Sequence, residues 1–244
     1  GLLDSAKDNA FEEIENDGDL DTDAKREKAK EVVAGLLDTL KKTAESGKLD
    51  GGAALVLKPK SMSFIAGGAV AEPKMLEDSL RKLVDLAKDE PDFPAVKFDA
   101  ETHKGVTFHT MSVPVPEDED QARKVLGETL DVVVGIGKDA AYLSVGTDAA
   151  EMLKMVINDS SMKVQDAVPM NMKVALTPIF KFAASVEDNP VLELITTTLE
   201  ESEGKDHILL KATPVDNGVN YRLTVEEGIL QAIGQAVKFR GGGL

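Results

Sequence analysis

Cysteine and tryptophan are absent from the 244-residue sequence, and aromatic residues make up only 4% of it. The lack of cysteine excludes disulfide bonds, thiolate metal ligands and cysteine nucleophiles, but it fits both reducing and oxidising compartments. Because 42% of the residues are hydrophobic and few are aromatic, the core must be mainly aliphatic. The chain is long enough to bury such a core in one large domain or two small ones.

Two kinds of segment are also missing. No stretch approaches the roughly 18 consecutive apolar residues of a membrane-spanning helix, and no basic and apolar signal peptide is present. We therefore expect a protein that does not span a membrane. Because the sequence begins with Gly1 and Leu2 rather than methionine, we expect a processing or cloning boundary there, with room for a signal upstream.

Basic residues are outnumbered, since 28 lysines and arginines face 44 acids and the formal net charge is −16. Such a surface repels phosphate backbones and anionic headgroups, so we expect no nucleic-acid partner. Half of this charge lies on residues 1–23, where nine acids against Lys7 give −8. Residues 12–23 lack apolar periodicity, which predicts an acidic N-terminal arm (1–23) that is solvated or leads into a helix.

Acidic residues alternate within this arm in the manner of a calcium-binding loop. The four residues are Asp17, Asp19, Asp21 and Asp23. Counted from Asp17, an EF-hand needs glycine at its sixth position and a bidentate glutamate at its twelfth, where Thr22 and Lys28 occur. The EF-hand is excluded, and a looser calcium site stays as an alternative to a solvated acidic surface.

Apolar periodicity and turn residues divide the rest of the chain into helices and antiparallel strands. Thr22 or Asp23 should cap a helix that runs to about Ser46, and Pro73 and Pro190 should each open a further helix. The expected strands and hairpins occupy residues 53–70, 95–113, 132–145, 170–186 and 207–225.

Residues 170–186 carry the clearest strand pattern, because apolar side chains recur there at every second position. The largest of them are Met170, Met172, Phe180 and Phe182. At about 3.3 Å per residue, this pattern predicts one strand of more than about 50 Å, or two strands joined at Pro178.

The order of elements indicates an internal repeat. Leu55–Pro59 matches Val174–Pro178, and both copies continue through a proline-opened helix to a hairpin. We therefore expect an α+β fold of antiparallel sheet, with helices packed on one face and two pseudo-repeats of strand, helix, hairpin and helix. The expected divisions are the arm, a first repeat at 24–130, a connecting hairpin at 131–146, a second repeat at 147–240 and a flexible tail at 241–244.

Three segments resemble uncharacterised exported proteins of planctomycete-type bacteria. They are Phe98–His109, Gly135–Leu143 and Asn217–Leu230, and the resemblance spans roughly residues 50–240. It implies an extracytoplasmic location, periplasmic or secreted, after removal of a signal. It implies no activity and no catalytic residue.

No motif carries recognisable catalytic or cofactor chemistry. Gly135–Lys138 fails as a phosphate loop, because Asp139 follows the lysine where serine or threonine is needed, so a hairpin turn is expected. Along an extended strand, His103 and His109 would lie roughly 20 Å apart, too far to share a metal ion unless the strand folds back. With His207 also isolated in the sequence, we predict no catalytic, cofactor-binding or metal-binding residue.

The sequence therefore leaves the function open. We favour a non-catalytic exported protein that binds an apolar small molecule or a protein partner between its two repeats. Its candidate ligand surface is Met170, Met172, Phe180 and Phe182, because methionine side chains adapt to varied ligands. The alternatives are a structural or scaffold protein of the cell envelope and a hydrolase with a dispersed active site. Ligand binding predicts an apolar cavity lined by alternate residues of 170–186, whereas a scaffold predicts a large exposed apolar patch or a stable oligomer.

Overall fold

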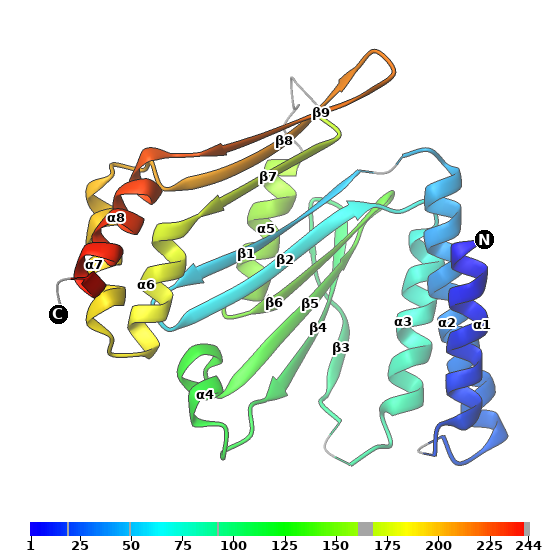
Figure 1. Ribbon diagram of the computed structural model, residues 1–244. Coiled ribbons are helices and arrows are strands. Elements are labelled where there is room, and N and C mark those ends of the chain that lie inside the picture. Colours follow the sequence, from blue (N-terminus) through cyan, green and yellow to red (C-terminus); the bar gives the residue numbers. More distant parts are fainter. Residues whose placement is uncertain (19, 49, 92, 161–167, 242–244) are drawn as a thin grey trace. The chain divides into compact units, whose positions relative to one another are not determined.

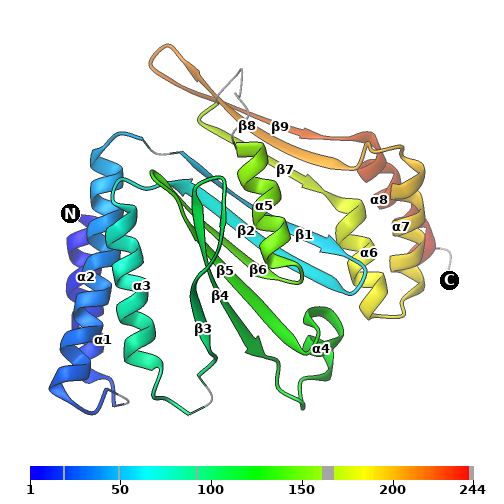
Figure 2. The same ribbon diagram turned by 180° about the vertical axis from the view of Figure 1, so that it is seen from behind.

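The computed structural model describes residues 1–18, 20–48, 50–91, 93–160 and 168–241, and it confirms an α+β fold with antiparallel sheets (Figures 1 and 2). The chain forms two compact units. The first contains Gly1–Leu55, Ser63–Val115 and Glu128–Ile157. The second contains Val56–Met62, Pro116–Gly127 and the described part of Asn158–Leu244.

The first unit is built around a six-stranded antiparallel sheet in the order β1-β2-β6-β5-β4-β3. Its strands are β1 (Gly51–Lys58), β2 (Ser61–Ala69), β3 (Val96–His103), β4 (Val106–Pro114), β5 (Thr129–Ile136) and β6 (Ala140–Gly146), although the last three residues of β1 and the first two of β2 belong to the second unit. Its helices are α1 (Leu2–Asn16), α2 (Asp23–Glu45), α3 (Pro73–Ala87) and most of α5 (Ala149–Ser160).

The core of the first unit lies between its sheet and α5. Phe108 on β4 and Leu153 on α5 are fully buried. Phe108 lies directly opposite Gly135 in the register, and a Cβ at Gly135 would come within 3.2 Å of the Leu153 side chain. Paired residues project to the same face of a sheet, so α5 covers the face that carries Phe108. Glycine at position 135 leaves room for this close approach.

The helices of the first unit begin as their capping residues predict. The Thr22 side chain accepts a hydrogen bond from the Lys25 amide, which confirms the predicted start of α2. Within the predicted acidic arm, α1 forms ion pairs with α2 through Lys7–Asp38 and Lys41–Asp4. The residues of the arm that form α1 therefore have an ordered partner surface, which is α2.

The second unit contains a three-stranded antiparallel sheet in the order β7-β8-β9. Its elements are α4 (Asp120–Leu126), β7 (Met170–Ala175), α6 (Leu176–Val186), α7 (Pro190–Glu201), β8 (His207–Val215), β9 (Gly218–Val225) and α8 (Glu227–Gly241). Both views show α6, α7 and α8 side by side at one end of the three strands, so the helices of this unit pack mainly on each other (Figures 1 and 2).

The prediction of strand structure throughout 170–186 is wrong, because the strand ends at Ala175 and α6 follows. Pro178 occupies the first turn of α6, where its missing amide hydrogen costs nothing. The Asp206 carboxylate accepts a hydrogen bond from the Thr177 amide and so caps this helix from a distant part of the chain. Apolar residues at 179, 182, 183 and 186 also fit a helical period, which the alternating pattern concealed.

The predicted repeat is not confirmed. Pro59 lies in the turn between β1 and β2, so the expected strand at 53–70 is a hairpin. Its proposed counterpart Pro178 lies inside a helix. Only the later elements share an order, since α3 and α7 each start at a proline and are each followed by a hairpin and a helix.

Candidate functional site

One face of the three-stranded sheet of the second unit is entirely apolar. Met170 pairs with Ala212, which pairs with Tyr221, and the register places the neighbouring alternate residues on the same face. This apolar sheet face consists of Met170, Met172, Val174, Ile208, Leu210, Ala212, Pro214, Val219, Tyr221, Leu223 and Val225. Ala212 is buried and Val174, Ile208 and Leu210 are half-buried, but the other residues of this face are exposed. An alternating strand normally buries such a face, so this exposure has to be explained.

The exposure is greatest on β9, the edge strand of this sheet. Tyr221 keeps 66% and Leu223 keeps 65% of its surface exposed, and every residue of β9 is exposed. Within the part of the chain that the structure describes, β9 pairs with β8 only, so the outer side of its backbone has no strand partner. A long edge strand without proline and with an apolar face is a template for pairing with another chain.

The opposite face of the same sheet is basic. It carries Lys173, Lys211 and Arg222, and Lys211 lies directly opposite Arg222. No aspartate or glutamate lies on this face within the three strands as the structure describes them. In a chain of net charge −16, this is a local reversal of sign. A partner strand on this edge would meet apolar surface on one side and positive charge on the other.

The structure separates the four predicted ligand-surface residues. Met170 and Met172 lie on the apolar sheet face and are exposed. Phe180 and Phe182 lie on α6 and are half-buried. The four residues therefore do not form the single strand face from which they were predicted.

A pocket of ≈ 610 Å³ lies in the second unit beside the start of α6. Its lining includes Leu57, Pro59, Pro178, Leu199 and Asp206. Ala175, Thr177, Pro178 and Lys181 of its lining belong to residues 170–186, but none of the four predicted ligand-surface residues lines it. An ion pair of 2.6 Å between Lys181 and Glu200, which also line the pocket, adds a polar group to its wall.

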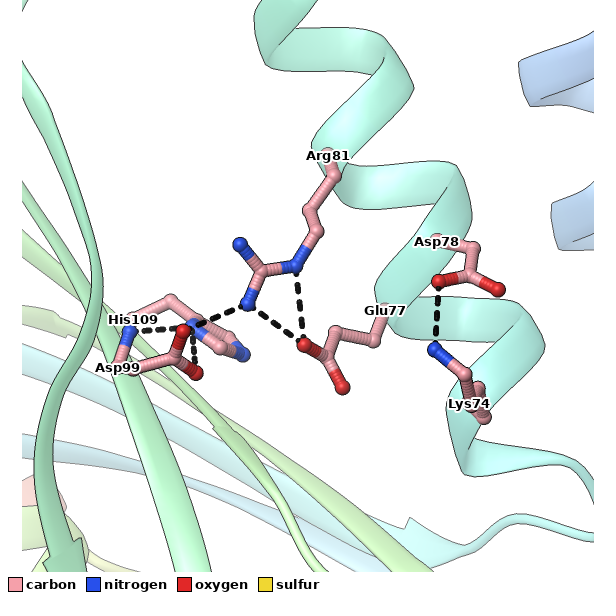
Figure 3. Close-up of polar contacts among 6 residues, drawn as sticks. All are labelled: Lys74, Glu77, Asp78, Arg81, Asp99 and His109. Carbon is pink, nitrogen blue, oxygen red and sulfur yellow. Dashed lines mark hydrogen bonds and ion pairs between the residues drawn. The ribbon is translucent and has the colours of Figure 1, made fainter.

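Two clusters combine carboxylates with a histidine, and the first lies between α3 and the β3–β4 hairpin (Figure 3). Arg81 on α3 donates hydrogen bonds to Glu77 at 2.7 Å and to Asp99 at 2.8 Å. Its guanidinium also lies 4.3 Å from the centre of the Phe98 ring. The two carboxylates of this first cluster therefore already have a cation between them.

His109 is the buried member of the first cluster. Its Nδ1 accepts a hydrogen bond of 3.1 Å from the Asp99 amide, so the proton of the neutral ring is on Nε2. Nε2 is buried and has no hydrogen-bond partner among the described residues. Burial lowers the pKa of His109, which Arg81 also lowers and the charges of Glu77 and Asp99 partly raise again. The ring is therefore held neutral as part of the core.

We expect the stability of the protein to fall as the pH is lowered through the ordinary histidine range. Because the pKa of His109 is lower in the folded protein, the unfolded chain takes up this proton first, and stability is lost by at most about 1.4 kcal/mol per pH unit. Urea unfolding between pH 8 and pH 6 measures this slope. His109→Asn should reduce the slope, whereas the control His103→Asn should keep it, and equal slopes in both variants would contradict this account.

The second cluster lies at the open end of the β8–β9 hairpin, where β8 begins and β9 ends. It contains Asp206, His207 and Glu226. His207 Nδ1 is 3.2 Å from Asp206 Oδ1 and 3.0 Å from Glu226 Oε2. The His207 amide also donates to Glu226 Oε2 at 2.9 Å. This hydrogen bond and the imidazole lower the pKa of Glu226. Burial would raise the pKa of Asp206, but the hydrogen bonds from Thr177 and the charge of His207 outweigh it and lower the pKa.

The outcome for the histidines differs from the sequence prediction in one respect. The chain folds back between His103 and His109, which lie on the two strands of the β3–β4 hairpin. Even so, His103 is not a member of either cluster. His207 is not isolated, because the register of the β8–β9 hairpin places it opposite Glu226.

No protein-family model matches the sequence, and neither does any curated protein. Across the ranges that the structure describes, no helix is both long enough and apolar enough to cross a membrane. The surfaces and clusters described above are therefore the features that bear on the function of this chain.

Proposed function

We propose that this chain is a non-catalytic binding protein that holds an extended segment of a partner protein by strand addition to β9. The observation that carries the proposal is the alternation along this edge strand. Val219, Tyr221, Leu223 and Val225 expose one apolar face, while Arg222 lies between them on the basic face. Strand addition uses the free backbone edge for affinity and alternate side chains for specificity.

The two faces define the chemistry of the partner. A strand paired with β9 would place every second side chain over the apolar sheet face and the others beside Arg222 and Lys211. Charge complementarity therefore favours a segment in which apolar and acidic residues alternate. The same charges oppose the pairing of two β9 strands in a register that brings Arg222 beside its own copy.

A protein segment fits this surface better than a small apolar molecule. Small-molecule sites are concave and enclose most of their ligand, whereas the apolar sheet face is the open side of three strands. Exposed apolar surface of this extent is typical of protein interaction sites, and tyrosine and methionine are enriched there. The extracytoplasmic location implied by the resemblance described above is part of the proposal, and the partner would then be an exported protein.

The experiment uses two synthetic peptides as long as β9, one alternating valine with glutamate and one alternating valine with lysine. We expect the full chain to bind the glutamate peptide more tightly in fluorescence polarisation. Leu223→Asp should weaken this binding roughly 10- to 100-fold, because it removes the burial of one large apolar side chain. Arg222→Glu should lower affinity for the glutamate peptide about 3- to 10-fold and raise it for the lysine peptide.

The matched control is Leu230→Asp, which places the same charge on an exposed leucine of α8 outside the sheet. It should leave peptide binding unchanged. Equal affinity for both peptides, or an equal loss in the Leu230 and Leu223 variants, contradicts strand addition. A stable dimer in sedimentation that Leu223→Asp dissociates would instead assign this surface to self-association, as the scaffold hypothesis expects.

A further inference from the structure

We propose that Asp206, His207 and Glu226 form a binding site for one divalent metal ion of the zinc class. The site is separate from the β9 edge, and nothing in the proposed strand addition requires it. Its donors are one imidazole nitrogen and two carboxylate oxygens, a set that suits Zn²⁺ and also Co²⁺.

The spacing of the ligand atoms fits a tetrahedral ion. With bonds of about 2.0–2.2 Å, two ligands of such an ion lie roughly 3.4 Å apart. The distances from His207 Nδ1 to Asp206 Oδ1 and Glu226 Oε2 are 3.2 and 3.0 Å. Each residue offers one ligand atom, and these atoms lie within 4.8 Å of one another. The two distances from His207 are thus within a few tenths of an ångström of this spacing, and the two carboxylate oxygens would have to approach each other by no more than about 1.4 Å to complete three bonds.

Hydrogen bonding accounts for one of the two contacts of His207 Nδ1, the one with Glu226 Oε2. Nδ1 of His207 carries at most one proton, and two carboxylate oxygens approach that atom at hydrogen-bond distance. One proton cannot form a well-aligned hydrogen bond with both oxygens. A cation placed among the three atoms would interact with each of them.

The first cluster contains an arginine that pairs with its two carboxylates, and the second cluster has no such residue among those described. In the first cluster, Arg81 neutralises Glu77 and Asp99, and the Asp99 amide occupies His109 Nδ1. In the second cluster, no lysine or arginine of the described chain lies within 4.0 Å of either carboxylate. The neighbouring Lys205 pairs with Glu227 instead, at 2.7 Å. Among the described residues, Lys205 therefore acts on Glu226 only from beyond 4.0 Å, and a divalent ion would balance the two carboxylates directly.

The surroundings of the cluster orient its ligands and leave it accessible. The second oxygen of Asp206 accepts the Thr177 amide hydrogen, and the backbone of His207 holds Glu226. Such outer hydrogen bonds fix the direction of metal ligands. Asp206 is buried, whereas His207 and Glu226 are partly exposed, so water has access for a fourth position.

The test uses the full chain without an oligohistidine tag, stripped with EDTA and desalted. Isothermal titration with ZnCl₂ should give one ion per chain, and Co²⁺ should give the visible absorption of a tetrahedral complex. Glu226→Gln keeps an oxygen that accepts the His207 amide hydrogen, and His207→Asn keeps a polar group near Nδ1. Each should weaken Zn²⁺ binding at least tenfold.

Glu77→Gln is the control, because it removes one carboxylate from the cluster that already contains an arginine. It should bind Zn²⁺ as the parent does. The proposal is overturned if the parent shows no saturable binding, or if Glu226→Gln binds as tightly as the parent, which would place the ion elsewhere. Should His207→Asn fail to fold by circular dichroism, the Glu226 variant decides alone. Peptide binding to β9 is measured separately, so either proposal can fail without the other.

Discussion

Leu153→Ala is expected to lower the free energy of unfolding by roughly 3–5 kcal/mol. Leu153 has 0% of its surface exposed and lies between α5 and the sheet of the first unit. Its side chain occupies the space left above Gly135, so the sheet backbone cannot move closer to fill a cavity there without wider repacking. Total stabilities of about 5–15 kcal/mol make this loss a large fraction of the whole.

Met155→Ala on the same helix is the matched control. Met155 is 57% exposed, so its truncation removes little packing and should change stability by no more than about 0.5 kcal/mol. Urea unfolding followed by circular dichroism measures both variants. Similar losses in the two would mean that α5 contributes through its helical structure rather than through the packing of Leu153.

Local signals in the sequence were sufficient for the elements that depend on neighbouring residues. Thr22 starts α2 because its side chain reaches an amide three residues ahead, and prolines start α3 and α7 for an equally local reason. The turn residues Asp216–Gly218 likewise predicted the β8–β9 hairpin from local sequence alone. These predictions needed no knowledge of distant contacts.

The prediction failed where a distant residue decides the structure. Residues 176–186 fit both a strand and a helix by their apolar pattern. The Asp206 carboxylate caps the Thr177 amide, and this contact joins positions that are far apart in the sequence. The predicted repeat relied on the residues before Pro59 and Pro178, but Pro59 lies in a turn and Pro178 in a helix.

The candidate sites were only partly visible in the sequence. Met170 and Met172 were predicted to lie on a ligand surface. The exposure of β9 depends on its place at the edge of the sheet, where the described residues put no strand beside it, and a sequence does not encode this locally. A signal for the second cluster did exist. Counting outward from the predicted turn pairs His207 with Glu226, since Ile208 pairs with Val225. His207 and Glu226 are far apart in the sequence, and only this pairing brings them together.

Gly228→Ala is expected to destabilise the second unit by about 2–4 kcal/mol. An added Cβ would lie 2.4 Å from the Ser202 Cβ and 2.6 Å from the Lys205 carbonyl oxygen, so the start of α8 would have to move. The Gly228 amide donates to that same carbonyl at 2.9 Å, and the movement would weaken this hydrogen bond as well. We expect the packing to be disturbed most where the start of α8 contacts residues 202–206.

Gly234→Ala, on the same helix, is expected to stabilise the protein rather than destabilise it. A Cβ at this position meets nothing within 4 Å, so alanine should stabilise α8 by about 0.5–1 kcal/mol through its higher helix propensity. Hydrogen exchange should show faster opening of the β8–β9 amides in the Gly228 variant and unchanged protection of β4 and β5. If Gly228→Ala stabilised the protein as Gly234→Ala is expected to, helix propensity would dominate at both positions, and the close contact at Gly228 would not hold α8 in place.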